Sequence, residues 1–562
     1  MSIDTSRSVT FLLLSSTRCA ESKRGVPTMF KRTITPTRTP NRLSYLWLAM
    51  AAALYLFTGG QWAIPLAAWL APLFLLRFVR TQRPLPGLLL AWLVRFAVAA
   101  IFVLQGTQFP PGTSPGIGYY ALVLFFSLVL VLPYLADRLI TPRLQGFVAT
   151  LVFPLAFTMI EYLISFGPSG TLNSIAYTQY GDLPFLQLVS VTGIWGITFL
   201  ITWFAAVVNW AWEQHFAWPQ VRGGGLLYAA ILAVVLLGGS ARLVLFSPQA
   251  TLVRVAGLSA SQAAVAAFNK QLPQETLSLL QSGKATQADR ALARSAFTTL
   301  DDDLFARSQQ EARAGAKIVV WPEASPTGAN ILQEDEPALI QRAGTLAQQE
   351  GIYLDMGLAV FLPDAGNGPF LKDEAVLLDP TGHVVWTYEI SHLVPGGQGL
   401  YVQGDGKVPL IESPYGRLAG VICFDLDYPG MVRQAGQGGA DLLFGPSDDW
   451  QAFDPLHAQH ATFRAIENGF SLVREASRGL SITVDYEGRV LASSDYFTTD
   501  QQVMVAYVPM HGVRTIYATI GDLFAWLCII GLAALIGLAI MQSRKRPSAA
   551  AVAPLPEPQP TR

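Results

Sequence analysis

Two residues in this sequence have the type and position of catalytic groups. Glu323 follows the apolar run KIVV and the pair Trp-Pro, and Cys423 directly follows the apolar run LAGVI. In open α/β sheets, ligand-binding and catalytic groups gather at the carboxyl ends of strands. A carboxylate there can act as a general base, and a thiol at a strand-to-loop elbow can act as a nucleophile. Taken one at a time, the commoner roles are a solvated loop glutamate and an inert core cysteine.

A third motif, YEISHLVP at 388–395, ends the apolar run HVVWTY. Further along the chain, SDDW at 447–450 and the helical pattern HATFRAIEN at 460–468 can add polar groups to the same end of a sheet. His457 and His460 lie three residues apart, but no carboxylate accompanies them in a metal-ligand pattern. The sequence has no GxGxxG motif and no P-loop, so we expect no cofactor and no metal.

Long apolar segments show what kind of protein must position these groups. Hydrophobic residues make up 51% of the 562 residues and charged residues 14%, against about 25% charged in a typical soluble domain. This composition excludes a wholly soluble, disordered or collagen-like chain. Nearly uncharged runs of about 20 residues, the length that crosses a bilayer as a helix, predict an α-helical membrane bundle of about eight transmembrane helices, at 43–58, 61–79, 86–105, 117–136, 145–165, 190–212, 225–246 and 519–541.

The charges between these runs predict the orientation of the chain. Lys and Arg cluster before the first run, around the end of the second, and after the fourth, sixth and eighth, whereas loops such as 106–116 and 166–185 carry none. By the positive-inside rule, both termini are cytoplasmic and the 247–518 segment lies on the outer, periplasmic side. The net charge of −1 offers no bulk attraction for nucleic acid, so no nucleic-acid partner is expected.

The 247–518 segment is typical of an α/β domain inserted between the seventh and eighth spans. Short β-branched or apolar runs bounded by Gly, Pro and Asp alternate with helical patterns at 285–314 and 336–350. This alternation favours a layered α/β fold with irregular hairpins toward its end. The predicted organisation is an N-terminal segment 1–42, a seven-helix domain 43–246, the α/β domain 247–518, a last span 519–541 and a disordered cytoplasmic tail 542–562.

The N-terminus and the other cysteines add little chemistry. Residues 1–28 contain a short apolar stretch without a clear cleavage site, and Met29 begins a basic stretch that leads into the first run. A true start at Met29 is therefore favoured over a signal peptide. Cys19, Cys423 and Cys528 are too few and too scattered for a disulfide framework or a zinc site.

The order of the motifs resembles a known family. WPEAS, YEISHLVP, GVICFD and RAIEN, in this order and spacing, resemble the carbon–nitrogen hydrolase (nitrilase) superfamily. With seven spans upstream and one downstream, the chain is similar specifically to the apolipoprotein N-acyltransferase family. The stretches NSIAYTQYGDLPFLQLVSVTGIWGITFLI and TIYATIGD agree, and the resemblance covers the chain from about Met29 to Gln542.

The resemblance implies an α-β-β-α sandwich for the 247–518 domain and a thiol acyltransferase activity. In the family, a Glu acts as general base, a Cys takes an acyl chain from a phospholipid as a thioester, and a Lys holds the developing oxyanion. The acyl chain then passes to the N-terminal amine of a lipoprotein. Carried over residue by residue, the Glu is Glu323 and the Cys is Cys423. The resemblance also implies a location in the cell inner membrane, and we expect a monomer.

The lysine of the family motif has no counterpart here. Its position within YEISHLVP is occupied by Ile390, and the Glu that follows in the family is replaced by Gln398. Between positions 372 and 423 the lysines are Lys372 and Lys407, neither of which lies in the motif. His392 lies two residues beyond Ile390 and would share its face if the strand continued, so it could lend a proton.

The missing cation bears on the activity and not on the fold. Loss of one oxyanion donor typically costs about 10²–10³ in rate. Without the cation, the Glu323 carboxylate near a thiolate raises both pKa values. Three hypotheses remain: a divergent acyltransferase that uses Glu323 and Cys423, a non-catalytic relative that binds lipid or lipoprotein, and a membrane-tethered carbon–nitrogen hydrolase acting on small amides.

Overall fold

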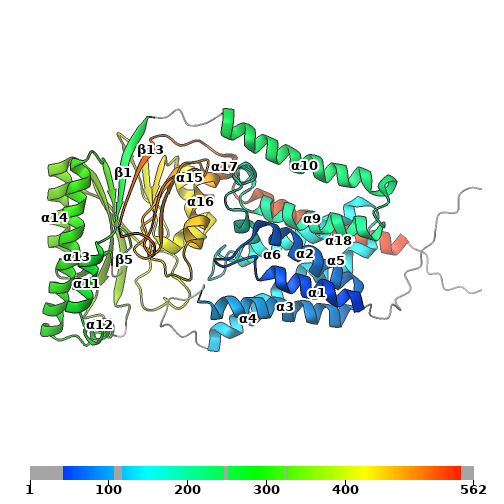
Figure 1. Ribbon diagram of the computed structural model, residues 1–562, viewed down its shortest axis with the longest axis horizontal. Helices are drawn as coiled ribbons and strands as arrows, with labels where there is room; N and C mark the ends of the chain where they lie inside the picture. Colours follow the sequence, from blue (N-terminus) through cyan, green and yellow to red (C-terminus); the bar gives the residue numbers. More distant parts are fainter. Residues whose placement is uncertain are drawn as a thin grey trace, which may run out of the picture. The chain divides into compact units, whose positions relative to one another are not determined.

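The computed structural model describes residues 42–106, 117–245, 251–323, 327–366, 368–500 and 502–545. Helices make up the parts before and after an α/β domain, as Figure 1 shows. Met29, the basic stretch that precedes the first run, and the tail from position 546 lie outside the described residues.

Each of the eight predicted apolar runs contains a helix. The longer helices outside the α/β domain are α1 (Arg42–Tyr55), α2 (Pro65–Thr81), α3 (Pro84–Leu104), α4 (Ile117–Val129), α5 (Leu132–Ile140), α6 (Val152–Ile164), α9 (Trp195–Glu213), α10 (Trp218–Leu245) and α18 (Leu523–Lys545). Among the described residues, six helical stretches are long and apolar enough to cross a membrane: Pro84–Leu104, Tyr119–Arg143, Phe147–Ile164, Trp195–Glu213, Trp218–Leu245 and Leu523–Arg544. The helical membrane region is therefore confirmed, and the number of eight spans remains a prediction.

The run at 190–212 is interrupted near its start. The short helix α8 (Val189–Thr192) ends at Gly193, whose φ of 63° favours glycine, and α9 begins at Trp195. A side chain at Gly193 would also collide with the ring of Tyr517 in α17 (Ile516–Ile520). The span therefore starts five residues later than the apolar run, because hydropathy does not register a turn made of uncharged residues.

The α/β domain contains two sheets. The first has the strand order β13-β1-β2-β4-β5-β6, with β3 paired to β4: β1 (Leu252–Leu258), β2 (Ile318–Val320), β3 (Ala329–Leu332), β4 (Tyr353–Phe361), β5 (Leu371–Leu378), β6 (Val384–Glu389) and β13 (Val503–Pro509). The second has the order β12-β11-β10-β9-β8-β7: β7 (Leu410–Ser413), β8 (Gly416–Gly420), β9 (Leu442–Phe444), β10 (Ser471–Arg474), β11 (Leu480–Val484) and β12 (Val490–Asp495). The centre of each sheet is parallel and the outer strands pair antiparallel.

Helices cover the outer face of each sheet, so the domain has four layers (Figure 1). One buried apolar cluster joins α11 (Gln262–Gln271), α13 (Gln287–Arg313) and α14 (Glu336–Glu350) to the first sheet. A second cluster fills the space between the sheets and joins the second sheet to α15 (Pro429–Gly438) and α16 (Leu456–Asn468). The predicted α-β-β-α sandwich and the two helices expected at 285–314 and 336–350 are confirmed.

Polar contacts join the helical part to the turn that follows Cys423. The backbone N–H and the hydroxyl of Thr171 donate to the carbonyl oxygen of Asp427 at 2.9 and 2.7 Å. Arg464 of α16 donates to the hydroxyl of Tyr177 at 3.1 Å. These contacts hold the α/β domain against the segment that connects α6 with α9.

Candidate active site

Cys423 lies in a strained turn at the end of a buried strand. It follows β8 and begins the short 3-10 helix η4 (Cys423–Asp427), with a φ of 44° that few non-glycine residues adopt. Its backbone N–H donates to the carbonyl oxygen of Pro446 at 2.9 Å, which holds the turn in place. Strain of this kind persists where the surrounding structure imposes it, and it concentrates at functional sites. The predicted strand-to-loop elbow is present.

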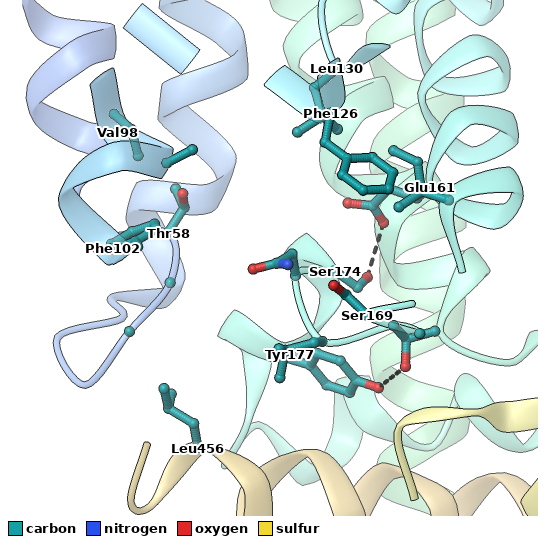
Figure 2. Close-up of a pocket in the computed structure, with 18 of the residues that line it drawn as sticks. Thr58, Val98, Phe102, Phe126, Leu130, Glu161, Ser169, Ser174, Tyr177 and Leu456 are labelled. Carbon is teal, nitrogen blue, oxygen red and sulfur yellow. Dashed lines mark hydrogen bonds between the residues drawn. The ribbon is translucent and has the colours of Figure 1, made fainter. Parts of the chain in front are cut away.

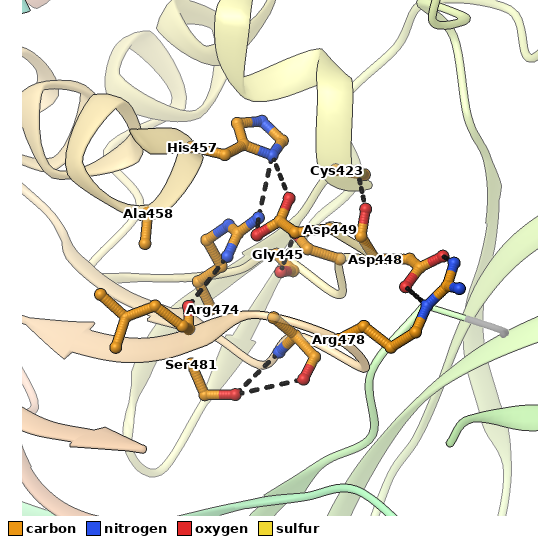
Figure 3. Close-up of polar contacts among 12 residues, drawn as sticks. Cys423, Gly445, Asp448, Asp449, His457, Ala458, Arg474, Arg478 and Ser481 are labelled. Atoms are coloured by element: carbon orange, nitrogen blue, oxygen red, sulfur yellow. Dashed lines mark hydrogen bonds and ion pairs between the residues drawn. The ribbon is translucent and has the colours of Figure 1, made fainter. Parts of the chain in front are cut away.

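The three neighbouring parallel strands β8, β9 and β10 direct polar residues to the same edge of the second sheet. Cys423 follows β8, Asp448 and Asp449 follow β9, and Arg474 ends β10. The Cys423 thiol donates to the carbonyl oxygen of Asp448 at 3.7 Å, as Figure 3 shows. The carboxyl ends of adjacent parallel strands therefore form one wall of the site.

Glu323 approaches the thiol from the other sheet. It follows β2, and its carboxyl group lies against both the Cys423 thiol and the carboxyl group of Asp373 on β5. Burial, together with the charges of Asp373 and Asp448, raises the pKa of Glu323 well above its usual value. Burial also raises the pKa of Asp373 to about 7. Such a carboxyl group is a better base at neutral pH than an ordinary glutamate.

Burial raises the pKa of the Cys423 thiol well above its usual value, and the neighbouring carboxylates of Glu323 and Asp449 raise it further. The guanidinium of Arg474 opposes this effect and favours the thiolate. A thiol of raised pKa needs a base to become a nucleophile, and the carboxyl group of Glu323 lies against this thiol.

Ile390 lies beside these groups without contributing charge. Its side chain is buried in the same apolar cluster as Cys423, directly after β6. Its backbone N–H donates to the carbonyl oxygen of Asp373 at 3.0 Å, which places it next to the carboxyl pair of Asp373 and Glu323. Isoleucine offers no cation and no hydrogen-bond donor here.

His392 is held by Asp425. The backbone N–H of His392 donates to Oδ1 of Asp425 at 2.8 Å, and its Nδ1 atom lies 2.9 Å from the same oxygen. Its ring stacks on that of Tyr428 with centroids 3.7 Å apart. These contacts fix the histidine against the turn that carries Cys423.

A buried charged cluster lies beside Cys423 and contains a potential set of metal ligands. The thiol of Cys423, a carboxylate oxygen of Asp449 and a ring nitrogen of His457 lie within 4.8 Å of one another. Arg474, however, donates to Asp449 at 2.7 Å and lies 2.9 Å from Nδ1 of His457. Nε2 of His457 faces Asp427 at 3.2 Å. Because an arginine already neutralises the carboxylate and both histidine nitrogens face other groups, these residues do not fit a metal ion.

Arg478, in the loop after β10, and Asp448, in the loop after β9, form an ion pair (Figure 3). Nε of Arg478 donates to Oδ1 of Asp448 at 3.0 Å, and Nη2 donates to Oδ2 at 2.6 Å. The Arg478 side chain is 35% exposed, whereas Arg474 is completely buried. Ser477 also donates to Asp448, at 2.6 Å.

A cavity lies in the helical part next to the domain (Figure 2). Apolar side chains of α3 and α4 line one part of it, among them Val98 and Phe126. Polar groups line another part of the cavity. They come from the segment between α6 and α9, which includes Thr171, and from α16, which includes His460. Both of these residues contact Asp427, at the end of the turn that Cys423 begins.

The structure brings Glu323 and Cys423 together, as the sequence predicts, and it places Ile390 beside them. Asp373, Arg474 and Arg478 also belong to this site, although the sequence analysis did not single them out. Asp373 lies near the amino end of β5, and only the antiparallel pairing of β5 with β4 brings it to the edge where Glu323 lies.

Comparisons with known proteins extend over both parts of the chain. Residues 49–207 match the apolipoprotein N-acyltransferase N-terminal domain, and residues 263–518 match the carbon-nitrogen hydrolase family. A solved amidase from Nesterenkonia sp. is 20% identical and covers 50% of this chain and 97% of its own, with a TM-score of 0.36.

Three curated relatives span most of this chain. The apolipoprotein N-acyltransferase of Geobacter metallireducens is 27% identical over 70% of this chain and 75% of its own length. The same enzyme of Bradyrhizobium diazoefficiens is 27% identical over 71% and 75%. Apolipoprotein N-acyltransferase 2 of Treponema pallidum is 25% identical over 78% and 81%. Since both family models match in sequence order and the relatives extend across them, this multi-pass membrane protein belongs to the apolipoprotein N-acyltransferase family of the carbon–nitrogen hydrolase superfamily.

Proposed function

We propose that this protein moves an acyl chain from a phospholipid, through a thioester at Cys423, to the N-terminal amine of a lipoprotein. The observation that carries the proposal is the placement of Glu323 against the thiol of Cys423 in a strained turn. The names of the relatives support the acyl transfer, and the cavity beside the domain offers the mixed apolar and polar lining that a phospholipid needs.

The chemistry follows from the two groups. Glu323 accepts the thiol proton, and the thiolate attacks the ester carbonyl of the phospholipid to give a tetrahedral oxyanion. Collapse of this intermediate breaks the ester C–O bond, and Glu323 returns the proton to the departing alcohol. In the second half, the lipoprotein amine attacks the thioester and gives its proton to Glu323. The C–S bond breaks as the amide forms, and Glu323 passes the proton to the departing thiolate, which restores the thiol.

The charges of the loops support a location and an organisation for the chain. We place residues 247–518 on the periplasmic side of the cell inner membrane with both termini in the cytoplasm, with boundaries at 43, 246, 519 and 541 for the helical regions. The positive-inside rule supports this orientation. A phospholipid donor requires access to the bilayer, which the adjoining helices would give.

Two other functions make different predictions. A non-catalytic relative would bind phospholipid or lipoprotein without forming a thioester, and the apolar Ile390 beside the thiol favours it as the second candidate. A membrane-tethered amidase would release ammonia from small amides.

Incubation of the full-length protein in phosphatidylethanolamine vesicles that carry an alkyne-tagged acyl chain separates acyl transfer from the other two functions. We expect a label on Cys423 that hydroxylamine releases and that passes to a diacylglyceryl-cysteine peptide. The variant Cys423→Ala should carry no label. Cys528→Ala, a change at a buried cysteine within α18, should label like the wild type. Equal labelling of the wild type and Cys423→Ala would contradict the assignment.

A further inference from the structure

Acyl transfer at Cys423 creates a negative charge that Ile390 cannot stabilise. When the thiolate adds to the ester carbonyl, the C–S bond forms and the carbonyl π electrons move onto oxygen. A positioned donor at that oxygen is usually worth about 10²–10³ in rate. Carboxyl groups, an isoleucine and the buried side chains of Arg474 and His457 surround the thiol, so a donor to the oxyanion has to be one that a substrate can reach.

The cations near Cys423 differ in whether a substrate can reach them. Arg474 and His457 are almost completely buried and are engaged with Asp449 and Asp427. His392 is fixed by Asp425 and Tyr428, as described above.

The two lysines nearest in sequence to the motif are also occupied. Lys372 pairs with Glu374 at 3.0 Å, and Lys407 pairs with Asp405 at 2.7 Å on the surface. Among the described residues around the thiol, Arg478 is the guanidinium with part of its surface open to solvent.

Backbone pairing places Arg478 close to the thiol. The backbone N–H of Ser447 donates to the carbonyl oxygen of Glu475 at 2.8 Å, and the backbone N–H of Ser477 donates to the carbonyl oxygen of Ser447 at 2.9 Å. The loop after β10 is thereby paired with the loop after β9, whose Asp448 accepts from Cys423.

The charge of Arg478 also reaches the general base. Burial alone would lower the pKa of Arg478, but the pair with Asp448 raises it, and the charge of Glu323 adds to the rise. Arg478 therefore lies within electrostatic range of Glu323 and remains a cation.

The contacts of the guanidinium leave one nitrogen for a ligand. Asp448 engages Nε and Nη2, and among the described residues Nη1 has no hydrogen-bond partner. A guanidinium held along one edge by a carboxylate keeps its orientation and presents its remaining N–H groups. We propose that Arg478 is the catalytic cation that donates to the acyl oxyanion at Cys423, in place of the lysine that Ile390 has replaced. This inference rests on the proposed acyl transfer.

The role can be tested by single-turnover labelling of Cys423 with the alkyne-tagged phosphatidylethanolamine vesicles. Arg478→Gln should slow thioester formation by about 10²-fold or more through kcat with little change in KM, and Arg478→Lys should restore part of the rate. Guanidinium ion at subdenaturing concentration should accelerate Arg478→Ala and leave the wild type unchanged. Ile390→Lys should rescue Arg478→Gln, because it restores a cation beside Glu323.

Three outcomes would overturn the inference. Labelling of Arg478→Gln within about twofold of the wild type, while Cys423→Ala stays unlabelled, would refute Arg478 and leave the proposed function intact. An equal loss of rate and melting temperature in Arg478→Gln and Asp448→Asn, without rescue by guanidinium or by Ile390→Lys, would show that the ion pair is structural only. Absence of a thioester in the wild type would refute the proposed function itself, together with the inference that rests on it.

Discussion

The hydroxyl group of Tyr388 donates a 2.6 Å hydrogen bond to Oδ2 of Asp425, two residues after Cys423. Asp425 also accepts from the backbone of His392 and lies completely buried. The end of β6 and the turn that carries the thiol are thus held together by one carboxyl group. This contact positions the segment that carries Ile390.

Loss of the Tyr388 hydroxyl should destabilise the domain. We expect Tyr388→Phe to lower the free energy of unfolding by about 1–3 kcal/mol, because it removes one donor from a buried carboxyl group. The measurement is thermal denaturation of the full-length protein in detergent. Tyr507→Phe removes a hydroxyl from a tyrosine that is 61% exposed and should change stability by no more than about 0.5 kcal/mol. Equal shifts for both variants would show that the contact with Asp425 has no net effect.

The rate of thioester formation should rise with pH. The pKa values of Glu323 and Cys423 are both raised by burial, so the base and the thiolate become available only as pH increases. Because the carboxyl group of Asp373 raises the pKa of Glu323, Asp373→Asn should move the rising limb of the pH–rate profile to lower pH. Asp405→Asn, which alters an exposed pair with Lys407, should leave the limb unchanged. An unmoved limb in Asp373→Asn would remove Glu323 as the base.

Stability should fall as pH rises, and Glu475 should account for part of the fall. Burial raises the pKa of Glu475 to about 8, and its carboxyl group accepts a hydrogen bond from Ser259 at 2.9 Å. A carboxyl group whose pKa is higher in the folded state stabilises the fold below its unfolded pKa, and this contribution is lost as pH rises through about 8. The loss amounts to at most about 1.4 kcal/mol per pH unit for one group.

Glu475→Gln should therefore flatten the dependence of the melting temperature on pH between about pH 5 and about pH 8. Glu412→Gln, a change at a side chain that is 77% exposed, serves as the control. Some dependence on pH should remain in Glu475→Gln, because burial also raises the pKa values of Asp355 and Glu467 to about 7. A Glu475→Gln profile as steep as that of the wild type would contradict the assignment.

Fusion proteins test the proposed orientation. Alkaline phosphatase fused at Gly283, between α12 (Gln274–Gln281) and α13, should be active because this loop is placed in the periplasm. Fluorescent protein fused after Arg546 should fluoresce, and a fusion at His215, between α9 and α10, provides a second cytoplasmic position. Phosphatase activity from the fusion after Arg546 would reverse the predicted topology.

The residues that sequence analysis identified share a local signal. Glu323 and Cys423 each follow a continuous apolar run, and the end of such a run can be recognised without knowing which strands pair. The helical region was likewise predictable because the length and composition of a span are local properties. The break at Gly193 is not visible in the sequence, since the residues around it are uncharged like those of the helix that follows.

The residues that sequence analysis missed depend on strand pairing. Asp373 reaches Glu323 because β5 runs antiparallel to β4, and hydrophobicity does not encode that register. Arg474 is the last residue of β10, and Arg478 lies in the loop after it. This strand has only four residues and ends in a charged side chain, so its sequence resembles that of a loop. A buried arginine is tolerated there because Asp449 pairs with it, which only the structure reveals.

Ile390→Lys tests whether the site keeps the geometry of an acyltransferase. The new ammonium would extend from a backbone that is already bonded to Asp373 and lie beside the carboxyl groups of Asp373 and Glu323. A cation at this position lowers the pKa values of both acids and of the Cys423 thiol, so the thioester should form faster and its pH limb should move down. We expect the rate of thioester formation to rise by up to about 10²-fold, which is the effect of one oxyanion donor. The rise should be smaller if Arg478 already donates to the oxyanion. Burial of an unpaired ammonium would be costly, but the two carboxyl groups supply its countercharge.

Single-turnover labelling measures the effect, with Ile390→Met as the control for size. A folded Ile390→Lys variant that labels no faster than Ile390→Met would show that the position beside Glu323 no longer reaches the acyl group.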